Sequence, residues 1–99
     1  MQLRLGMIGF GRVASSVMDA LSDSDKIKVV SVGSRSLAKA KRIAEYYNIE
    51  SYFGSYEELI TSDIVEAVYI ALPNSLHFFY CKLALENDKS VICEKPMTV

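Results

Sequence analysis

The stretch LRLGMIGFGRVA, residues 3–14, decides the fold. An apolar run over residues 3–10 predicts a buried strand, and glycines at positions 9 and 11 fall at its end. Residues 12–22 then place apolar side chains at spacings of three and four, which predicts an amphipathic helix. A strand that passes through glycines directly into a helix is the first step of a strand–helix–strand unit.

The same alternation continues along the chain. Further strands are predicted over 27–34, 51–53, 66–72 and 90–94, with helices over 36–47, 55–61 and 73–87. Ser36 is expected to cap the first of these helices, and Ser55 with Glu58 has the spacing of a capping box at the second. Long helical connections between strands imply a parallel sheet with right-handed crossovers. We therefore predict an α/β fold with a doubly wound, five-stranded parallel sheet. Tyrosines 46, 47, 52 and 56 are expected around the second helix and third strand, and Tyr80 is expected to face the core.

Composition restricts the classes of function. The 99 residues are 51% hydrophobic and 23% charged, with a net charge of −1, which is typical of one globular domain without a nucleic-acid or membrane partner. Cys81 and Cys93 have neither CxxC nor zinc spacing, and there is one histidine, so no metal site is expected. No apolar run approaches a membrane span, and no secretory signal is recognised, so we expect a cytoplasmic protein with reduced thiols.

The first turn, GFGRVA, has the spacing GxGxxA. The first glycine permits a tight turn, the second lets the backbone approach a pyrophosphate, and the small third residue lets helix and strand pack closely. The helix N-terminus offers free N–H groups to phosphates. Alone the pattern is weak, but here it follows an apolar strand and opens a helix, which favours a dinucleotide site over a ligand-free turn. The cofactor-binding candidates in this turn are Gly9, Phe10, Gly11, Arg12 and Val13.

The end of the second strand reads Ser34-Arg35-Ser36, with Lys39 one helical turn further on. Proteins that bind NAD usually carry an acidic residue near Ser34 for the ribose hydroxyls. A carboxylate would repel a 2′-phosphate, whereas arginine binds one with two hydrogen bonds. The sequence therefore favours NADP(H), with NAD(H) as the alternative. The other interpretation is that Arg35 and Lys39 merely solvate the start of the helix.

The end of the fourth strand reads Ala71-Leu72-Pro73-Asn74, followed by His77. Ligands of open α/β sheets bind at the carboxyl ends of the strands, so this segment is a candidate for the same cleft. Pro73 stiffens the exit of the strand, and Asn74 or Ser75 can cap the next helix. Judged alone, Asn74 reads equally as a simple cap, and His77 reads better as a surface residue.

In this order and spacing, GFGRVA, VGSRS, LPNSLH and CEKP resemble the N-terminal half of the Gfo/Idh/MocA oxidoreductases over essentially the whole chain. The closing EKP, seventeen residues after the histidine of PNxxH, is the most specific part. The resemblance implies a Rossmann domain that is followed, in family members, by a second α/β domain. We therefore expect residues 1–99 to be a partial NAD(P)-binding Rossmann domain. It is truncated before the last helix and strand and lacks the C-terminal substrate and oligomerisation domain.

The resemblance also implies roles for individual residues. The pyrophosphate is expected at Gly9, Gly11, Arg12 and Val13, and the adenosine ribose at Ser34, Arg35 and Lys39. The cofactor cleft is expected to be lined by Leu72, Pro73, Asn74 and His77, although Leu72 replaces the usual Thr or Ser and leaves one hydroxyl contact in doubt. The EKP motif assigns catalytic roles to Glu94 and Lys95 and a cofactor contact to Glu94, Lys95 and Pro96. Its lysine lies between nicotinamide and substrate, where an ammonium stabilises a developing alkoxide and relays a proton.

The expected function is an NAD(P)-dependent oxidoreductase that acts on CH–OH or carbonyl groups of sugars, inositols or similar small molecules. The isolated 99-residue chain is not expected to be active alone. We also expect it to self-associate as a homo-oligomer, because a missing domain exposes apolar surface. The alternatives are a non-catalytic NAD(P)-sensing or protein-interaction module, for which a lysine at the nicotinamide has no use, and an inert remnant that binds nothing.

Overall fold

The computed structural model describes residues 2–9, 18, 19, 21, 25–72 and 74–93. Its strands are β1 (Leu3–Ile8), β2 (Ile27–Gly33), β3 (Ser51–Phe53), β4 (Ala67–Ile70) and β5 (Ser90–Cys93). Its helices are α2 (Leu37–Tyr47), α3 (Tyr56–Ile60) and α4 (Asn74–Glu86). These elements confirm the predicted alternation and differ from it only by a residue or two at the ends. The helix predicted over 12–22 lies mostly outside the described residues, although residues 18, 19 and 21 are helical.

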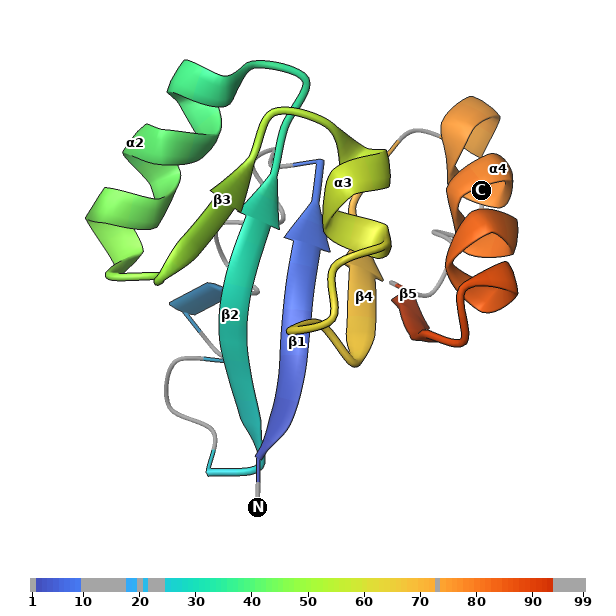
Figure 1. The fold of residues 1–99 in the computed structure, drawn as a ribbon, viewed down its shortest axis with the longest axis horizontal. Coiled ribbons are helices and arrows are strands. Elements are labelled where there is room, and N and C mark those ends of the chain that lie inside the picture. The colour runs from blue at the N-terminus through green and yellow to red at the C-terminus, as the bar shows by residue number, and fades with distance from the viewer. Residues whose placement is uncertain (1, 10–17, 20, 22–24, 73, 94–99) are drawn as a thin grey trace.

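The five strands form one parallel sheet in the order β3-β2-β1-β4-β5. The chain first adds strands on one side of β1 and then returns to add β4 and β5 on the other side (Figure 1). The order therefore reverses between β1 and β4, which is the topological switch point of a doubly wound sheet. This arrangement confirms the predicted fold class.

Two separate hydrophobic cores cover the two faces of the sheet. Along β4 the side chains alternate between them: Ala67 and Tyr69 join the core under α2, and Val68 and Ile70 join the core under α3 and α4. Tyr56 is buried in the second core, against which Phe53 of β3 also packs, so its expected place near the third strand is found, but it is not part of the core under α2. Tyr46 is 81% exposed and does not pack into either core, whereas Tyr80 packs against the second core as expected.

Local hydrogen bonds fix the ends of the shorter elements. Ser36 is confirmed as the N-cap of α2, because its side chain accepts from the backbone N–H of Lys39 at 3.3 Å. Ser55 is the N-cap of α3, since its Oγ accepts from the Glu58 N–H at 3.1 Å. In place of the backbone bond of a full capping box, the Ser55 hydroxyl donates to Glu58 Oε1 at 3.1 Å. The ammonium of Lys89 donates to two carbonyls, at Ser62 and Val65, at 2.7 Å each and so ties β5 to the turn before β4.

A β-bulge interrupts the pairing of β1 with β2. Leu5 pairs with Val29, but Gly6 pairs with Ser31, so Val30 is the extra residue. Beside the bulge, the hydroxyl of Ser31 is fully buried and has no hydrogen-bond partner among the described residues. A buried polar group without a partner costs about 1–3 kcal/mol of stability, so this hydroxyl weakens the fold.

We expect Ser31→Ala to raise the free energy of unfolding by about 1 kcal/mol, because it removes an unpaired hydroxyl without leaving a large cavity. Urea denaturation followed by circular dichroism measures the change. Ser55→Ala is the matched control: it removes a hydroxyl that caps α3 and should lower stability by about 1 kcal/mol. If both substitutions destabilise equally, the Ser31 hydroxyl has a partner in solution.

Candidate functional site

Gly9 follows β1 directly and lies against the end of β4. Its backbone has φ +72°, a left-handed conformation in which side chains are strained. A Cβ at this position would lie 2.6 Å from the carbonyl oxygen of Ala71 and 2.3 Å from Cδ2 of Leu72. The first glycine of the GxGxxA motif is therefore required by space and by conformation. It also lies at the switch point, where nucleotide ligands of doubly wound sheets bind.

The end of β2 forms a depression of about 450 Å³. Ser34 is buried at its base, whereas Arg35 and Lys39 are exposed at its rim. The described residues that line it are Ser34, Arg35, Ser36, Lys39 and Tyr56, and none of them is acidic. The first turn of α2 also contains no acidic residue, so its free N–H groups and two cations together favour an anion. The predicted ribose-side residues are thus brought together.

The two serine hydroxyls of this loop accept hydrogen bonds from backbone N–H groups of the same segment. Ser34 Oγ accepts from the backbone N–H of Ser36 at 3.2 Å, and Ser36 Oγ caps α2. The loop is thereby held in one shape, and a bound anion would depend mainly on the guanidinium and the ammonium. Tyr56, which was not predicted as a site residue, supplies an aromatic wall. Tyr56 is about twenty residues after this loop in the sequence and reaches the depression only through the folding of the chain. No local sequence signal could therefore have found it.

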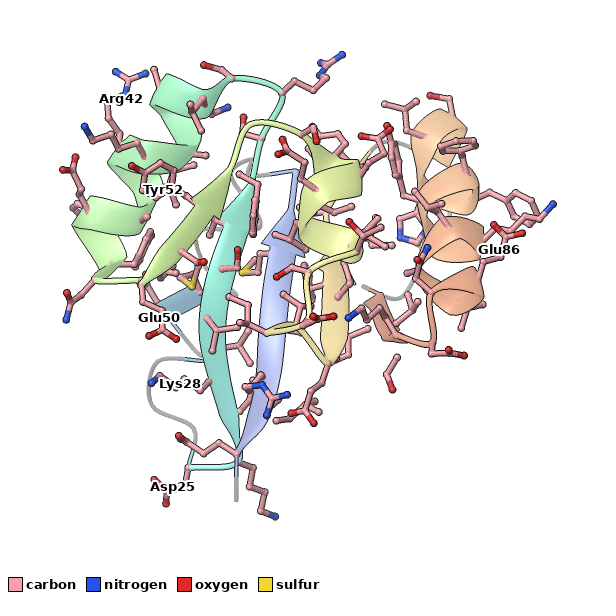
Figure 2. The ribbon with its side chains drawn as sticks, in the orientation of Figure 1. Asp25, Lys28, Arg42, Glu50, Tyr52 and Glu86 are labelled. Atoms are coloured by element: carbon pink, nitrogen blue, oxygen red, sulfur yellow. The ribbon has the colours of Figure 1, made fainter. Side chains whose placement is uncertain are left out.

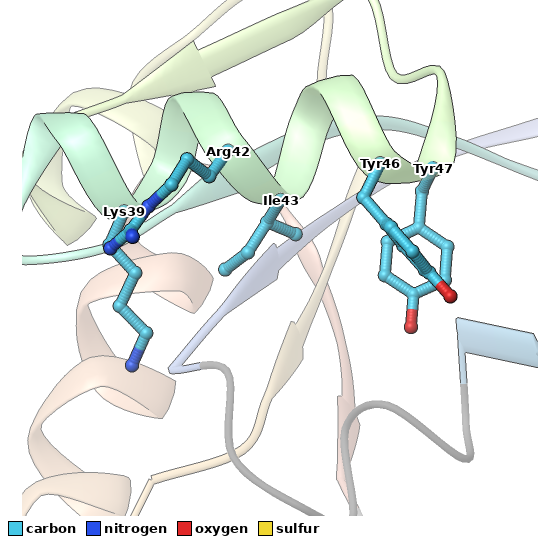
Figure 3. A pocket seen from close by; sticks show the side chains of 5 residues that line it. All are labelled: Lys39, Arg42, Ile43, Tyr46 and Tyr47. Carbon is cyan, nitrogen blue, oxygen red and sulfur yellow. The ribbon is translucent and has the colours of Figure 1, made fainter.

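The outer side of α2 continues the positive surface. A second depression of about 370 Å³ is lined by Lys39, Arg42, Ile43, Tyr46 and Tyr47. Figure 3 shows Lys39 and Arg42 at one end of this depression and the two tyrosines at the other. The tyrosine rings meet edge to face with centroids 4.8 Å apart. Lys39 lines both depressions, so Arg42 adds to the positive potential near the end of β2.

The residues after β4 are only partly arranged as predicted. Leu72 is half-buried and packs over Gly9 and against the second core, so it fills space where a hydroxyl was expected. His77 lies in the first turns of α4, and its Nδ1 is 3.4 Å from the Sγ of Cys81. The contact with Cys81 leaves Nε2 as the nitrogen of His77 that can meet a ligand. α4 begins at Asn74, one residue after the predicted start of the helix.

Tyr80 links α4 to α3 beside the same edge of the sheet. Its hydroxyl donates to Glu57 Oε2 at 3.3 Å, and its ring meets Tyr56 edge to face with centroids 5.1 Å apart. Burial, followed by the neighbouring Glu57 carboxylate, raises the pKa of the Tyr80 phenol above its ordinary value of 10.0. Because Tyr56 also lines the depression after β2, this contact connects the middle of α4 to the loop after β2.

Several predicted site residues lie outside the described residues. They are Phe10, Gly11, Arg12, Val13, Pro73, Glu94, Lys95 and Pro96. Their assignments remain predictions from the sequence. Within the described part of the chain, no group of three or more His, Cys, Asp or Glu side chains could hold a metal ion. Likewise, no described helix has both the length and the apolar character of a membrane span.

Comparisons with known proteins agree with this geometry. A family model described as "Oxidoreductase family, NAD-binding Rossmann fold" (GFO_IDH_MocA) matches residues 3–99. The oxidoreductase YgjR of Escherichia coli is 41% identical over 96% of the chain, and the NADP⁺-dependent D-xylose 1-dehydrogenase 2 of Haloferax volcanii is 38% identical over 95%. The crystal structure of the 3-ketoreductase KijD10 from Actinomadura kijaniata, in complex with TDP-benzene and NADP, superposes with a TM-score of 0.90 at 35% identity, covering 99% of the chain. The chain spans 29%, 28% and 31% of these three proteins, respectively.

We expect Gly9→Ala to lower the free energy of unfolding by about 3 kcal/mol, because it combines a left-handed backbone with a clash against a carbonyl oxygen. Gly54→Ala is the control: a Cβ there lies 3.1 Å from Cβ and 3.5 Å from Cα of Leu37, without the left-handed backbone of Gly9, so we expect a change within about 1 kcal/mol. Urea denaturation of the two variants measures the difference. Equal stability of both variants would show that the close approach at Gly9 is relaxed in solution.

Tyr80 should make stability depend on pH in alkaline solution. In the unfolded chain its phenol titrates near pH 10, whereas in the folded chain the raised pKa keeps it protonated to higher pH. The contribution of Tyr80 to the free energy of unfolding is therefore fully present below about pH 10 and is lost as the pH rises through the pKa of the folded state. Urea denaturation between about pH 8 and 11 should show wild type losing stability relative to Tyr80→Phe. Tyr46→Phe, which changes a ring that is 81% exposed, is the control, and its stability should fall with pH as that of wild type does.

Proposed function

Because the chain belongs to the Gfo/Idh/MocA oxidoreductase family, we propose that it is the dinucleotide-binding part of an NADP(H)-dependent oxidoreductase. The observation that carries the cofactor preference is the depression after β2, where Arg35 and Lys39 stand over the N-terminus of α2 and no acidic residue lines the wall. A 2′-phosphate is an anion of the right charge for this loop, whereas a free ribose 2′-hydroxyl would lack the carboxylate that usually accepts its hydrogen bond. Relatives whose names specify NADP support the proposal.

The residues fit a dinucleotide along the whole carboxyl edge. Gly9 allows β1 to end close against Ala71 and Leu72 at the switch point, and Ile8 of β1 pairs with both Gly33 of β2 and Ile70 of β4, so the three strand ends are level. The pyrophosphate is assigned to the turn that begins at Gly9, and the adenosine ribose to the loop that begins at Ser34. When bound, the nicotinamide supplies the hydride chemistry.

We place the reaction at the end of β5. This strand pairs Cys93 with Ile70 of β4, so the chain reaches the same edge of the sheet just before Glu94 and Lys95 in the sequence. Lys95 is proposed to orient the substrate and to donate a hydrogen bond to its reacting oxygen, with Glu94 beside it. The substrate class is a sugar, an inositol or a similar hydroxyl or carbonyl compound. Because catalysis needs the substrate held against the cofactor, we expect no turnover by the 99 residues alone.

The test is a titration of the 99-residue chain with NADPH and with NADH at fixed salt. The fluorescence of the reduced nicotinamide reports binding directly, because it is excited at wavelengths that protein side chains do not absorb. We expect saturable binding that favours NADPH, and Arg35→Ala should weaken NADPH binding about ten-fold or more while leaving NADH binding nearly unchanged. Lys41→Ala, an exposed cation on α2 outside the depression, is the matched control.

Two results would contradict the proposal. Tighter binding of NADH than of NADPH by wild type, with no effect of Arg35→Ala, would reject the 2′-phosphate site. Binding of neither cofactor by a chain whose circular dichroism shows the folded sheet would reject cofactor binding by this part of the protein.

A further inference from the structure

One residue that lines the depression after β2 is buried and still has an unused polar group. Tyr56 is only 6% exposed, and its ring packs in the second core. Its hydroxyl has no hydrogen-bond partner among the described residues, yet it is not one of the unpartnered oxygens that are closed off from solvent. The small exposed part of Tyr56 therefore includes the hydroxyl, and the residue lines the depression. Its polar end is thus open to a ligand there.

The core itself requires only the ring of Tyr56. That ring meets the ring of Tyr80 edge to face with centroids 5.1 Å apart, and a phenylalanine would keep the same contact. Tyr80 uses its own hydroxyl within the protein, because it donates to Glu57 Oε2 at 3.3 Å. Among the described residues nothing uses the hydroxyl of Tyr56 in this way, so water or a bound group in the depression is its partner.

The segments that carry the two cations and the hydroxyl are joined by hydrogen bonds. Gly33 of β2 pairs with Phe53 of β3, and the Ser34 N–H donates to the Phe53 carbonyl at 3.1 Å. Figure 1 shows the loops after β2 and β3 leaving the same edge of the sheet. Ser55 then caps α3, which begins at Tyr56. The depression is therefore formed before a ligand binds, so little conformational freedom is lost on binding.

The charges around the depression favour an anion. Figure 2 shows Asp25 and Glu50 toward the opposite end of the sheet, where they precede β2 and β3. The carboxylates of Glu57 and Glu58, which follow Tyr56, each accept a hydrogen bond from a neighbouring hydroxyl. Neither is among the described residues that line the depression, whereas its rim carries two cations. The positive potential there is therefore not cancelled by a lining carboxylate.

We propose that Tyr56 determines cofactor specificity, because its hydroxyl donates a hydrogen bond to the 2′-phosphate of NADP(H) beside Arg35 and Lys39. This inference rests on the proposed function and adds a donor from α3 to the two cations. A phosphate monoester has three acceptor oxygens, so the guanidinium, the ammonium and the phenol can bind it together. A hydrogen bond to an ionised oxygen is about twice as strong as one between neutral groups, so the phenol discriminates against the ribose hydroxyl of NADH.

A titration of wild type and Tyr56→Phe with NADPH and with NADH, at fixed salt, tests the proposal. Tyr56→Phe should weaken NADPH binding about ten-fold and leave NADH binding unchanged. Because NADH lacks only the phosphate, the four affinities remove the two partners of one contact separately, as in a double-mutant cycle. The substitution keeps the buried ring, and urea denaturation should show that the variant folds as wild type does.

A second titration separates the adenosine end of the cofactor from the nicotinamide end. Adenosine 2′,5′-bisphosphate and adenosine 5′-monophosphate are each used to displace NADPH. Tyr56→Phe should lower the affinity for the bisphosphate about ten-fold and leave that for the monophosphate unchanged. Tyr80→Phe is the matched control: it removes the hydroxyl of the adjoining ring, which hydrogen-bonds to Glu57, and should bind all four nucleotides as wild type does.

The results that overturn the inference differ from those that overturn the proposed function. If wild type prefers NADPH and Tyr56→Phe binds it equally well, the hydroxyl does not contact the phosphate, and the proposed function stands. If Tyr56→Phe weakens NADPH and NADH by the same factor, Tyr56 acts through the shape of the wall or through the ribose, and the inference is wrong. If wild type does not prefer NADPH, the 2′-phosphate site is rejected and both fail together.

Discussion

The close approach of Gly9 to the end of β4 is the constraint on which the rest of the site depends. Ile8 pairs with Ile70, and the Ala71 N–H donates to the Ile8 carbonyl at 3.0 Å, so the two strands end at the same level. From there the chain leaves β1 toward β2 and leaves β4 toward β5. Only glycine at this position lets the end of β1 lie this close to the carbonyl oxygen of Ala71 and the side chain of Leu72.

In the loop after β2, the hydroxyl groups stabilise the loop and the cationic groups are left for a ligand. Its hydroxyls hold the loop, through Ser34 to the Ser36 N–H and through Ser36 to the Lys39 N–H. Its cations, on Arg35 and Lys39, extend into solvent over the free end of α2. A loop fixed by its own hydrogen bonds need not be ordered again when an anion binds, so the electrostatic attraction is less offset by lost conformational freedom.

Local patterns were sufficient to predict the elements, the sheet and the grouping of Ser34, Arg35 and Lys39 at the end of β2. The spacing of apolar residues predicted α2 and α4, and Ser36 and Ser55 marked the starts of two helices because capping is a short-range interaction. Three features could not be predicted: the bulge at Val30, the packing of Leu72 over Gly9, and the presence of Tyr56 in the wall of the depression. Each depends on which residues from distant strands meet, and no periodicity within one segment contains that information.

The helices on the two faces of the sheet expose different kinds of side chain. α2 covers one face and turns Lys39, Lys41 and Arg42 outward, which suits water and phosphate groups. α4 covers the other face and turns Phe78 and Leu85 outward, which suits a protein surface. Both helices bury an alanine against the sheet, Ala44 in α2 and Ala84 in α4, so both pack closely on the strands and the difference lies only in what each presents outward. The cationic surface of α2 and the apolar surface of α4 thus lie on opposite faces of one sheet and share no exposed residue.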